Sequence, residues 1–244
     1  MPELRIKKLG LIACQVLWRE LTYFAAQSSA EISFFFQPQG LHNDPDKMRR
    51  DLQAAIDRIE AEHEFDQLIF GYGLCSRGIE GLKSKKTTMV FPRAHDCLTL
   101  LLGSRSRQEQ IYCEHPDAYW YSPGWIETGT QPSLERRDRE RALLRQKYDE
   151  EQSLWLHEQL SGWGKNYHKA IYLDFQIGPR EQWIAYTRKC AQELGWQYLE
   201  LKGDPTLVRN LVNMEWDENN FLIVPAGIEL KLSYDDGLMK CRNI

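Results

Sequence analysis

Short apolar runs alternate with amphipathic stretches along the first 110 residues. The apolar runs cover residues 9–14, 32–36, 65–70 and 87–91. Runs of this length, bounded by turn residues, predict buried β-strands. Residues 15–26, residues 43–59 and the leucine-rich stretch after Pro92 carry apolar side chains at helical spacing. The resulting order, β-α-β-α-β-β-α, predicts an α/β fold with a mostly parallel sheet and helices on both faces.

A similar rhythm returns in the second half, where residues 170–175, 196–201 and 221–224 predict strands and 178–194 and 204–214 predict helices. The highly charged stretch 131–159 predicts one long helix or two shorter ones. We interpret it as a solvated helix face that serves either as a connector between the halves or as an oligomer contact. We therefore expect two Rossmann-like halves, as two lobes or one extended sheet. The boundaries are an N-terminal α/β half over 1–128, a charged helical connector over 129–165 and a C-terminal α/β half over 166–244.

Composition excludes several classes of protein. The net charge of −4 and the pI of about 5.9 give no overall attraction to nucleic acid or to an anionic membrane. No apolar run approaches the ~20 residues of a membrane-spanning helix. The N-terminal apolar run lacks the cleavage site of a signal peptide, so we expect a cytoplasmic protein whose six cysteines stay reduced.

Reactive side chains follow three of the predicted strands, at the point where each strand ends. Cys14 ends the first strand. The strand 65–70 is followed by Gly-Tyr-Gly-Leu-Cys-Ser-Arg-Gly over 71–78, and the strand 87–91 by Pro-Arg-Ala-His-Asp-Cys over 92–97. Open α/β sheets bind ligands at the carboxyl ends of their strands. The sequence therefore predicts a site at this edge.

The first chemistry that this edge could carry is metal binding. Cys14, Cys75 and Cys97, together with His95, would bring three thiols and an imidazole into one crevice. Thiolate and imidazole ligands suit zinc or iron, and three ligands with an open fourth position are typical of a catalytic metal. The alternative is that the cysteines are small buried hydrophobes, which is the favoured interpretation for Cys14 alone.

The second chemistry is anion binding by the same two loops. Gly73 and Gly78 would let the backbone approach a ligand, Arg77 and Arg93 would supply charge, and Asp96 would complete the substrate-binding set. The glycine spacing matches neither the dinucleotide fingerprint nor the P-loop, so ATP and NAD are not expected. An equally good interpretation is a tight turn whose arginines pair with nearby carboxylates.

The third chemistry is covalent catalysis, in which the thiol of Cys75 or Cys97 would pair with the imidazole of His95. A helix beginning near Cys97 would lower the pKa of its thiol. Because His95 and Cys97 lie two residues apart in one segment, their mutual geometry does not follow from the sequence.

Three blocks of the chain resemble the signature of a bacterial and archaeal family, domain of unknown function 1638. They are the blocks 71–78, 92–105 and 121–125. The family name carries no activity, but many members are encoded beside corrinoid-dependent methyltransferases, which implies a role near methyl transfer or corrinoid handling. The family's motif residues correspond here to Cys75, Arg77, Arg93, His95, Asp96 and Cys97.

Together these arguments favour a metal-binding enzyme that acts on a small anionic substrate in methyl-transfer or one-carbon metabolism. Its zinc or iron would be held by Cys14, Cys75, His95 and Cys97. One alternative is a non-catalytic metal or corrinoid carrier that serves a partner methyltransferase or corrinoid protein. Another is a metal-free protein that binds a small anion. A second copy of the chain is a further expected partner, whereas nucleic acid and membrane are not.

Overall fold

The computed structural model describes residues 5–129, 131–233 and 237–242, and the chain forms two compact units. The first unit combines the residues up to Glu109 with those from Gly203 onward, and the second unit is Gln110–Lys202. The second unit is therefore inserted into the sequence of the first. The boundaries that we expected after residues 128 and 165 both lie inside this insertion.

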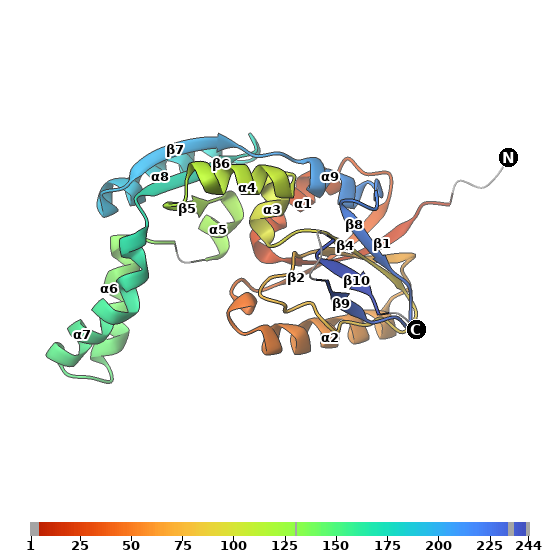
Figure 1. Cartoon of the computed structure of the whole chain (residues 1–244), viewed down its shortest axis with the longest axis horizontal. Coiled ribbons are helices and arrows are strands. Elements are labelled where there is room, and N and C mark those ends of the chain that lie inside the picture. The colour runs from red at the N-terminus through yellow and green to blue at the C-terminus, as the bar shows by residue number, and fades with distance from the viewer. Residues whose placement is uncertain (1–4, 130, 234–236, 243–244) are drawn as a thin grey trace. The chain divides into compact units, whose positions relative to one another are not determined.

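The first unit is built on a five-stranded sheet with the order β2-β1-β3-β4-β8 (Figure 1). The first four strands are parallel, and β8 runs antiparallel to β4. Its strands are β1 (Lys8–Cys14), β2 (Glu31–Gln37), β3 (Gln67–Gly71), β4 (Thr88–Pro92) and β8 (Phe221–Val224). The predicted α/β class with a mostly parallel sheet is thus confirmed. The strand 221–224, placed by its sequence position in a C-terminal half, pairs instead with β4.

Helices lie on both sides of this sheet. On one side α1, α3 and α9 pack near one another, and α2 lies on the other (Figure 1). The side chain of Asp44 caps α2 by accepting a hydrogen bond from the backbone N–H of Lys47, and Pro45 occupies the first turn. The helices are α1 (Trp18–Ala25), α2 (Pro45–Glu62), α3 (Cys97–Leu102), α9 (Thr206–Val212) and the short 3-10 turns Gln15–Leu17 and Leu41–Asn43.

The centre of the sheet is tightly packed because β1 and β3 are covered on both faces. Phe70 on β3 and Phe91 on β4 are fully buried, and their rings stack with centroids 4.1 Å apart. A Cβ atom at Gly71 would lie 2.6 Å from the Cβ of Ala13, so only glycine permits this approach of β3 to β1. The sheet edge that carries the predicted site therefore rests on a rigid base.

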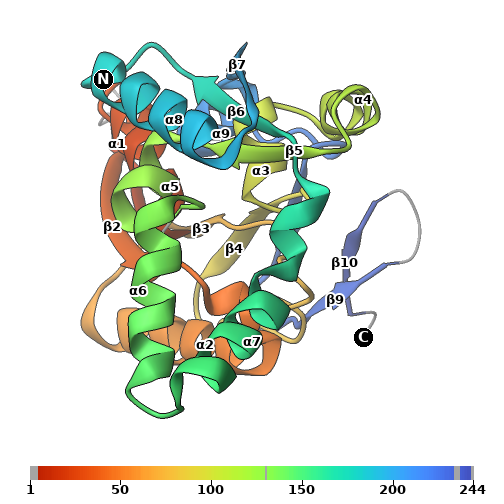
Figure 2. The same cartoon turned by 90° about the vertical axis from the view of Figure 1, so that its left-hand side faces the viewer.

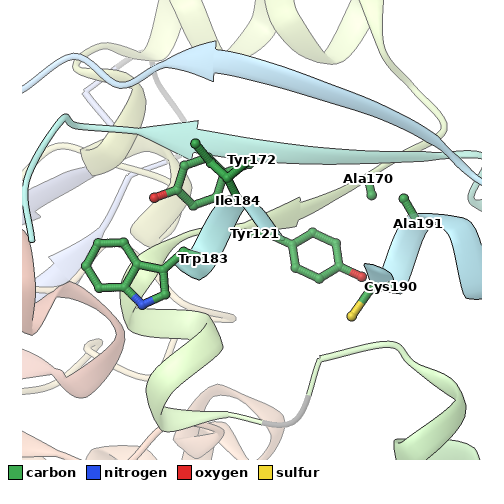
Figure 3. Packing of buried hydrophobic residues seen from close by; sticks show 7 residues of the cluster. All are labelled: Tyr121, Ala170, Tyr172, Trp183, Ile184, Cys190 and Ala191. Carbon is green, nitrogen blue, oxygen red and sulfur yellow. The ribbon is translucent and has the colours of Figure 1, made fainter. Parts of the chain in front are cut away.

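The second unit has a parallel three-stranded sheet of order β5-β6-β7, with α8 packed against it. Its core gathers Tyr121, Tyr172, Trp183, Ile184 and Cys190 with two alanines (Figure 3). The elements are β5 (Ala118–Tyr121), α5 (Pro123–Thr128), α6 (Leu134–Arg145), α7 (Glu150–Ser161), the 3-10 turn Gly162–Asn166, β6 (Lys169–Asp174), α8 (Arg180–Leu194) and β7 (Gln197–Lys202).

The charged stretch predicted as one or two helices forms the two-helix hairpin α6–α7 (Figure 2). No residue of α6 is buried, and α7 buries only Ser153 and His157. The remaining elements are α4 (Arg105–Glu114), which crosses the boundary between the units, and the antiparallel pair β9 (Leu230–Leu232) and β10 (Met239–Cys241). Within the described ranges, no helix has the length and apolarity needed to cross a bilayer.

Candidate functional site: a cluster of buried thiols

The loops that follow β3 and β4 are joined through their backbones. The N–H of Leu74 donates to the carbonyl of Ala94 at 2.9 Å, and the N–H of Cys75 donates to the carbonyl of His95 at 3.1 Å. A Cβ atom at Gly73 would lie 2.6 Å from the backbone nitrogen of Asp96. Glycine is therefore required at 73 for the loops to meet, which sets Cys75 beside the segment that leads to Cys97.

Cys75 begins a turn with an uncommon backbone conformation. Cys75, Ser76 and Arg77 have φ angles of 44°, 57° and 72°, so three consecutive residues other than glycine are left-handed. Each such residue costs roughly 1–2 kcal/mol relative to the right-handed form. Strain of this kind persists where the surrounding structure enforces it and is concentrated at functional sites. Here the turn directs residue 75 inward, and its side chain is buried.

A network around Asp96 fixes the position of Cys97. The carboxylate of Asp96 accepts hydrogen bonds from the N–H of Thr99 at 2.9 Å and from the side-chain amide of Gln108 at 3.0 Å. The hydroxyl of Thr99 donates to Gln108 at 2.6 Å. Because Asp96 caps α3, the first residue of that helix, Cys97, has a defined backbone direction.

The side chains of Cys14, Cys75 and Cys97 come close enough at this edge to act on one another. The side chain of Cys97 interacts with that of Cys14 and with that of Cys75. The three side chains are free thiols and are only 5%, 6% and 8% exposed. Cys97 therefore stands at the centre of a row of three thiols that come from the ends of β1, β3 and β4.

The hydroxyl group of Tyr72 is a fourth polar group at this place. Tyr72 is 2% exposed, and its hydroxyl has no hydrogen-bond partner among the described residues. Burial raises the pKa of Tyr72, and the nearby thiols of Cys14, Cys75 and Cys97 raise it further. A buried hydroxyl without a partner costs about 1–3 kcal/mol. Tyr72 was not among the predicted site residues, although a tyrosine between two glycines directly after a buried strand was a usable signal.

The environment keeps two of the thiols protonated at neutral pH. The pKa of Cys14 is raised by its hydrogen bond to Cys97, by burial and by the charge of Cys97, against the backbone N–H of Val16. For Cys97, the hydrogen bond from Cys14 lowers the pKa, but the bond to Cys75, burial and the charges of Cys75 and Asp96 raise it well above its ordinary value. This argues against a free thiolate nucleophile at Cys97.

The other predicted site residues lie around the thiol cluster in different roles. The side chain of His95 is exposed, and the described structure records no contact between its ring and a thiol. Arg77 pairs with Glu80 at 2.8 Å and keeps 59% of its side chain exposed. Arg93 donates to the backbone carbonyls of Glu218, Gly237 and Met239, so this guanidinium ties the loop after β4 to β10 and to the chain before β8.

Gly78 and the remaining cysteines lie outside the thiol cluster. A Cβ atom at Gly78 would lie 2.4 Å from the sulfur of Met48, which explains the glycine through packing against α2. Cys190 is buried in the core of the second unit, whereas Cys113 is exposed and Cys241 is partly exposed. As the side chains stand, no group of three or more His, Cys, Asp or Glu residues in the described ranges forms a ready metal site.

A family model described as a protein of unknown function, DUF1638, matches residues 36–212. The chain belongs to this family. No curated protein and no solved structure matches it. The DUF1638 stretch includes Tyr72, Cys75 and Cys97 and the whole of the second unit. It begins after β1, so Cys14 lies outside the part that the DUF1638 model describes.

Proposed function

We propose that the protein binds a thiophilic transition metal ion, zinc or iron, through Cys14, Cys75 and Cys97. The observation that carries this proposal is the convergence of three buried thiols from three strand ends beside a buried hydroxyl without a partner. A purely structural core would gain more from a phenylalanine at position 72, because a buried hydroxyl is costly unless it is paired.

The position of the cluster in the sheet supports the proposal. From β1 the chain passes to β2 on one side, whereas β3 and β4 lie on the other side. In open parallel sheets of this order, ligands bind outside the carboxyl ends of the strands where the order reverses. Cys14 ends β1, and Cys75 lies four residues beyond the end of β3, so two of the three thiols flank this switch point. We also propose that each half of the chain has a Rossmann-like arrangement.

The chemistry of the side chains also supports a metal. Thiolates select zinc and iron over magnesium or calcium, and three protein ligands leave a fourth position for water or substrate. Cys97 already contacts both of the other thiols. Rotation of Cys14 and Cys75 about χ1, together with loss of the thiol protons, would turn the row into a three-sided site. The hydroxyl of Tyr72 would then donate to a thiolate or to the fourth ligand.

The finer proposal is an enzyme in which this metal activates a small anionic substrate. Arg77 supports it, because its largely exposed guanidinium lies two residues after Cys75 on the strained turn. Arg93 is less suited to this role, since its donors already bind backbone carbonyls. A cytoplasmic location fits all six cysteines being free thiols, because disulfides are rare in reducing compartments.

The test is metal content after purification without oxygen, followed by titration of the metal-free protein with Co²⁺. We expect about one equivalent of zinc or iron, and sulfur-to-cobalt charge-transfer bands in the near ultraviolet. The Cys97→Ser variant should lose both signals, whereas Cys113→Ser, which changes an exposed thiol on α4, should keep them. Circular dichroism verifies that each variant is folded. Absence of metal and of cobalt bands in the native protein would refute the proposal.

A further inference from the structure

The second unit contains a groove of about 710 Å³ between the α6–α7 hairpin and the segments that flank β6 and β7. Its volume is in the range of small-molecule sites. The groove is lined by residues 110–202 alone and does not involve the thiol cluster. It is therefore a separate candidate site.

The arginines of α6 differ in how they are paired. Arg136, Arg139 and Arg145 each form an ion pair with a carboxylate of the same hairpin, at 2.7, 2.8 and 2.5 Å. Arg137 and Arg141 line the groove, and neither has an ion pair or side-chain hydrogen bond with any described residue. The two are four residues apart, so they share one face of the helix. This face presents two uncommitted guanidinium groups to the groove.

A buried histidine of α7, His157, lines the groove together with these two arginines. His157 is 5% exposed, lines the groove and lies 3.2 Å from the hydroxyl of Ser161. Burial lowers the pKa of His157, and the charges of Arg141 and Arg137 lower it further, against those of Glu140 and Asp138. The imidazole is therefore mainly neutral at pH 7 and available for hydrogen bonding.

The carboxylates that line the groove do not neutralise its two arginines. Glu158 lies 3.5 Å from Lys165, so these two residues compensate each other. Glu151 is the other carboxylate that lines the groove. Glu140 lies 3.7 Å from Nε2 of His157 and is paired with Arg136. Two arginines without an ion pair to a described residue therefore line the groove together with one such carboxylate, Glu151, and Arg side chains bind phosphate oxygens in a bidentate manner.

Aromatic rings form another part of the lining. The rings of Tyr167 and Trp196 have centroids 6.0 Å apart, and both contact Tyr119, which in turn packs on Tyr121 in the core. Trp155 on α7 also lines the groove and is 61% exposed. A large exposed indole beside a packed aromatic surface offers a planar ring a place to stack, and such contacts are worth about 0.5–1.5 kcal/mol beyond area burial.

We infer that this groove binds a phosphorylated compound with a planar ring, such as a nucleoside monophosphate. The phosphate lies against Arg137 and Arg141, and the ring lies against Trp155 and the Tyr167–Trp196 surface. Neither the dinucleotide fingerprint nor the P-loop is involved, because the phosphate is bound by side chains of one helix face rather than by a glycine-rich loop.

The experiment is isothermal titration calorimetry of the full chain with AMP, adenosine and inorganic phosphate, in the presence of EDTA. AMP should bind more tightly than either fragment. The double variant Arg137→Gln/Arg141→Gln should weaken AMP binding at least tenfold. The matched control, Arg139→Gln/Arg145→Gln, removes the same charge from paired positions of the same helix and should change the affinity less than twofold. Trp155→Ala should weaken AMP without changing phosphate.

Two results would overturn the inference: no binding of AMP at millimolar concentration, or equal loss in both double variants, which would indicate a general effect of surface charge. Thermal unfolding verifies that the variants are folded. The same titration on the Cys97→Ser variant separates this groove from the thiol cluster, because AMP should bind unchanged there.

Discussion

The backbone N–H of Cys75 donates to the carbonyl of His95 at 3.1 Å, and this bond joins the two loops that carry the outer and central thiols of the cluster. It depends on Gly73, whose position leaves no room for a side chain. The geometry of the thiol cluster is therefore controlled by a residue that has no reactive group.

Substitution of Gly73 by alanine should separate these loops. The new Cβ would meet backbone atoms of Ala94 and Asp96, which have little freedom to move, so we expect a destabilisation of about 1–3 kcal/mol. The variant should also lose Co²⁺ binding. Gly162→Ala is the control, because nothing lies within 4 Å of the added atom. Urea unfolding and cobalt absorbance provide the two measurements. Full cobalt binding by Gly73→Ala would contradict the role given to this contact.

Removal of the Tyr72 hydroxyl should weaken metal binding without lowering the stability of the metal-free protein. In metal-free protein, Tyr72→Phe deletes a buried hydroxyl that has no partner, so the free energy of unfolding should stay constant or rise by about 1 kcal/mol. With zinc present, the affinity should fall, because a donor to the metal site is lost. Melting temperatures in EDTA and in zinc give the comparison. A decrease in stability in EDTA would assign the hydroxyl a structural hydrogen bond instead.

The thiols should differ widely in their reactivity toward iodoacetamide. Cys14 and Cys97 are buried and have raised pKa values, whereas Cys113 is exposed. Because the thiolate is the reactive form, alkylation of Cys14 and Cys97 at pH 8 should be at least about a hundredfold slower than that of Cys113. Peptide mass spectrometry over time measures the rates. In denaturant all six cysteines should react. Rapid native alkylation of Cys97 would favour a nucleophilic role for this residue.

The carboxylate of Glu60 should make the free energy of unfolding depend on pH. Burial opposes its ionisation, but the hydroxyl of Ser84 and the backbone N–H groups of Lys85, Lys86 and Thr87 together lower the pKa of Glu60 to about 2. The ordinary value is 4.5, so this carboxylate stabilises the folded state above about pH 4.5, and the contribution is lost as the pH falls toward 2. A shift of this size corresponds to about 3 kcal/mol.

Unfolding of native protein and Glu60→Gln between pH 6 and pH 2 tests this assignment. The native free energy of unfolding should decrease by about 3 kcal/mol more than that of the variant over this range. Glu62→Gln, at an exposed position on the same helix, should follow the native curve. Parallel curves for the native protein and Glu60→Gln would rule out the assignment.

Much of the secondary structure followed from the periodicity of the sequence. Strand 221–224 was located to the residue, and α2 begins where Asp44 and Pro45 signalled its start. The helix over 180–194 likewise ends at Gly195, which is left-handed with a φ of 69°. These features could be predicted because each depends on local patterns of a few residues.

The pairing of the strands could not be read from the same patterns. A strand such as β8 has equivalent apolar positions whether it extends a second sheet or returns to β4, and only packing over more than 100 residues decides. The hairpin β9–β10 was missed because its strands are three residues long. For the site, the placement of Cys14, Cys75 and Cys97 at strand ends followed from the sequence, whereas their convergence depends on the strand order, which did not. The exposure of His95 depends instead on a side-chain direction that spacing does not fix.

The interrupted first unit has a consequence for the order of folding during synthesis. Residues 110–202 form a contiguous unit, whereas the first sheet lacks β8 until the chain beyond residue 203 has left the ribosome. The N–H of Asp204 donates to the carbonyl of Leu101 at 3.0 Å, so the returning chain is bonded to α3, which precedes the inserted unit. The inserted unit can therefore be complete while the edge of β4 is still unpaired. The ribosome thus releases the strand that protects this edge only after the rest of the sheet has been made.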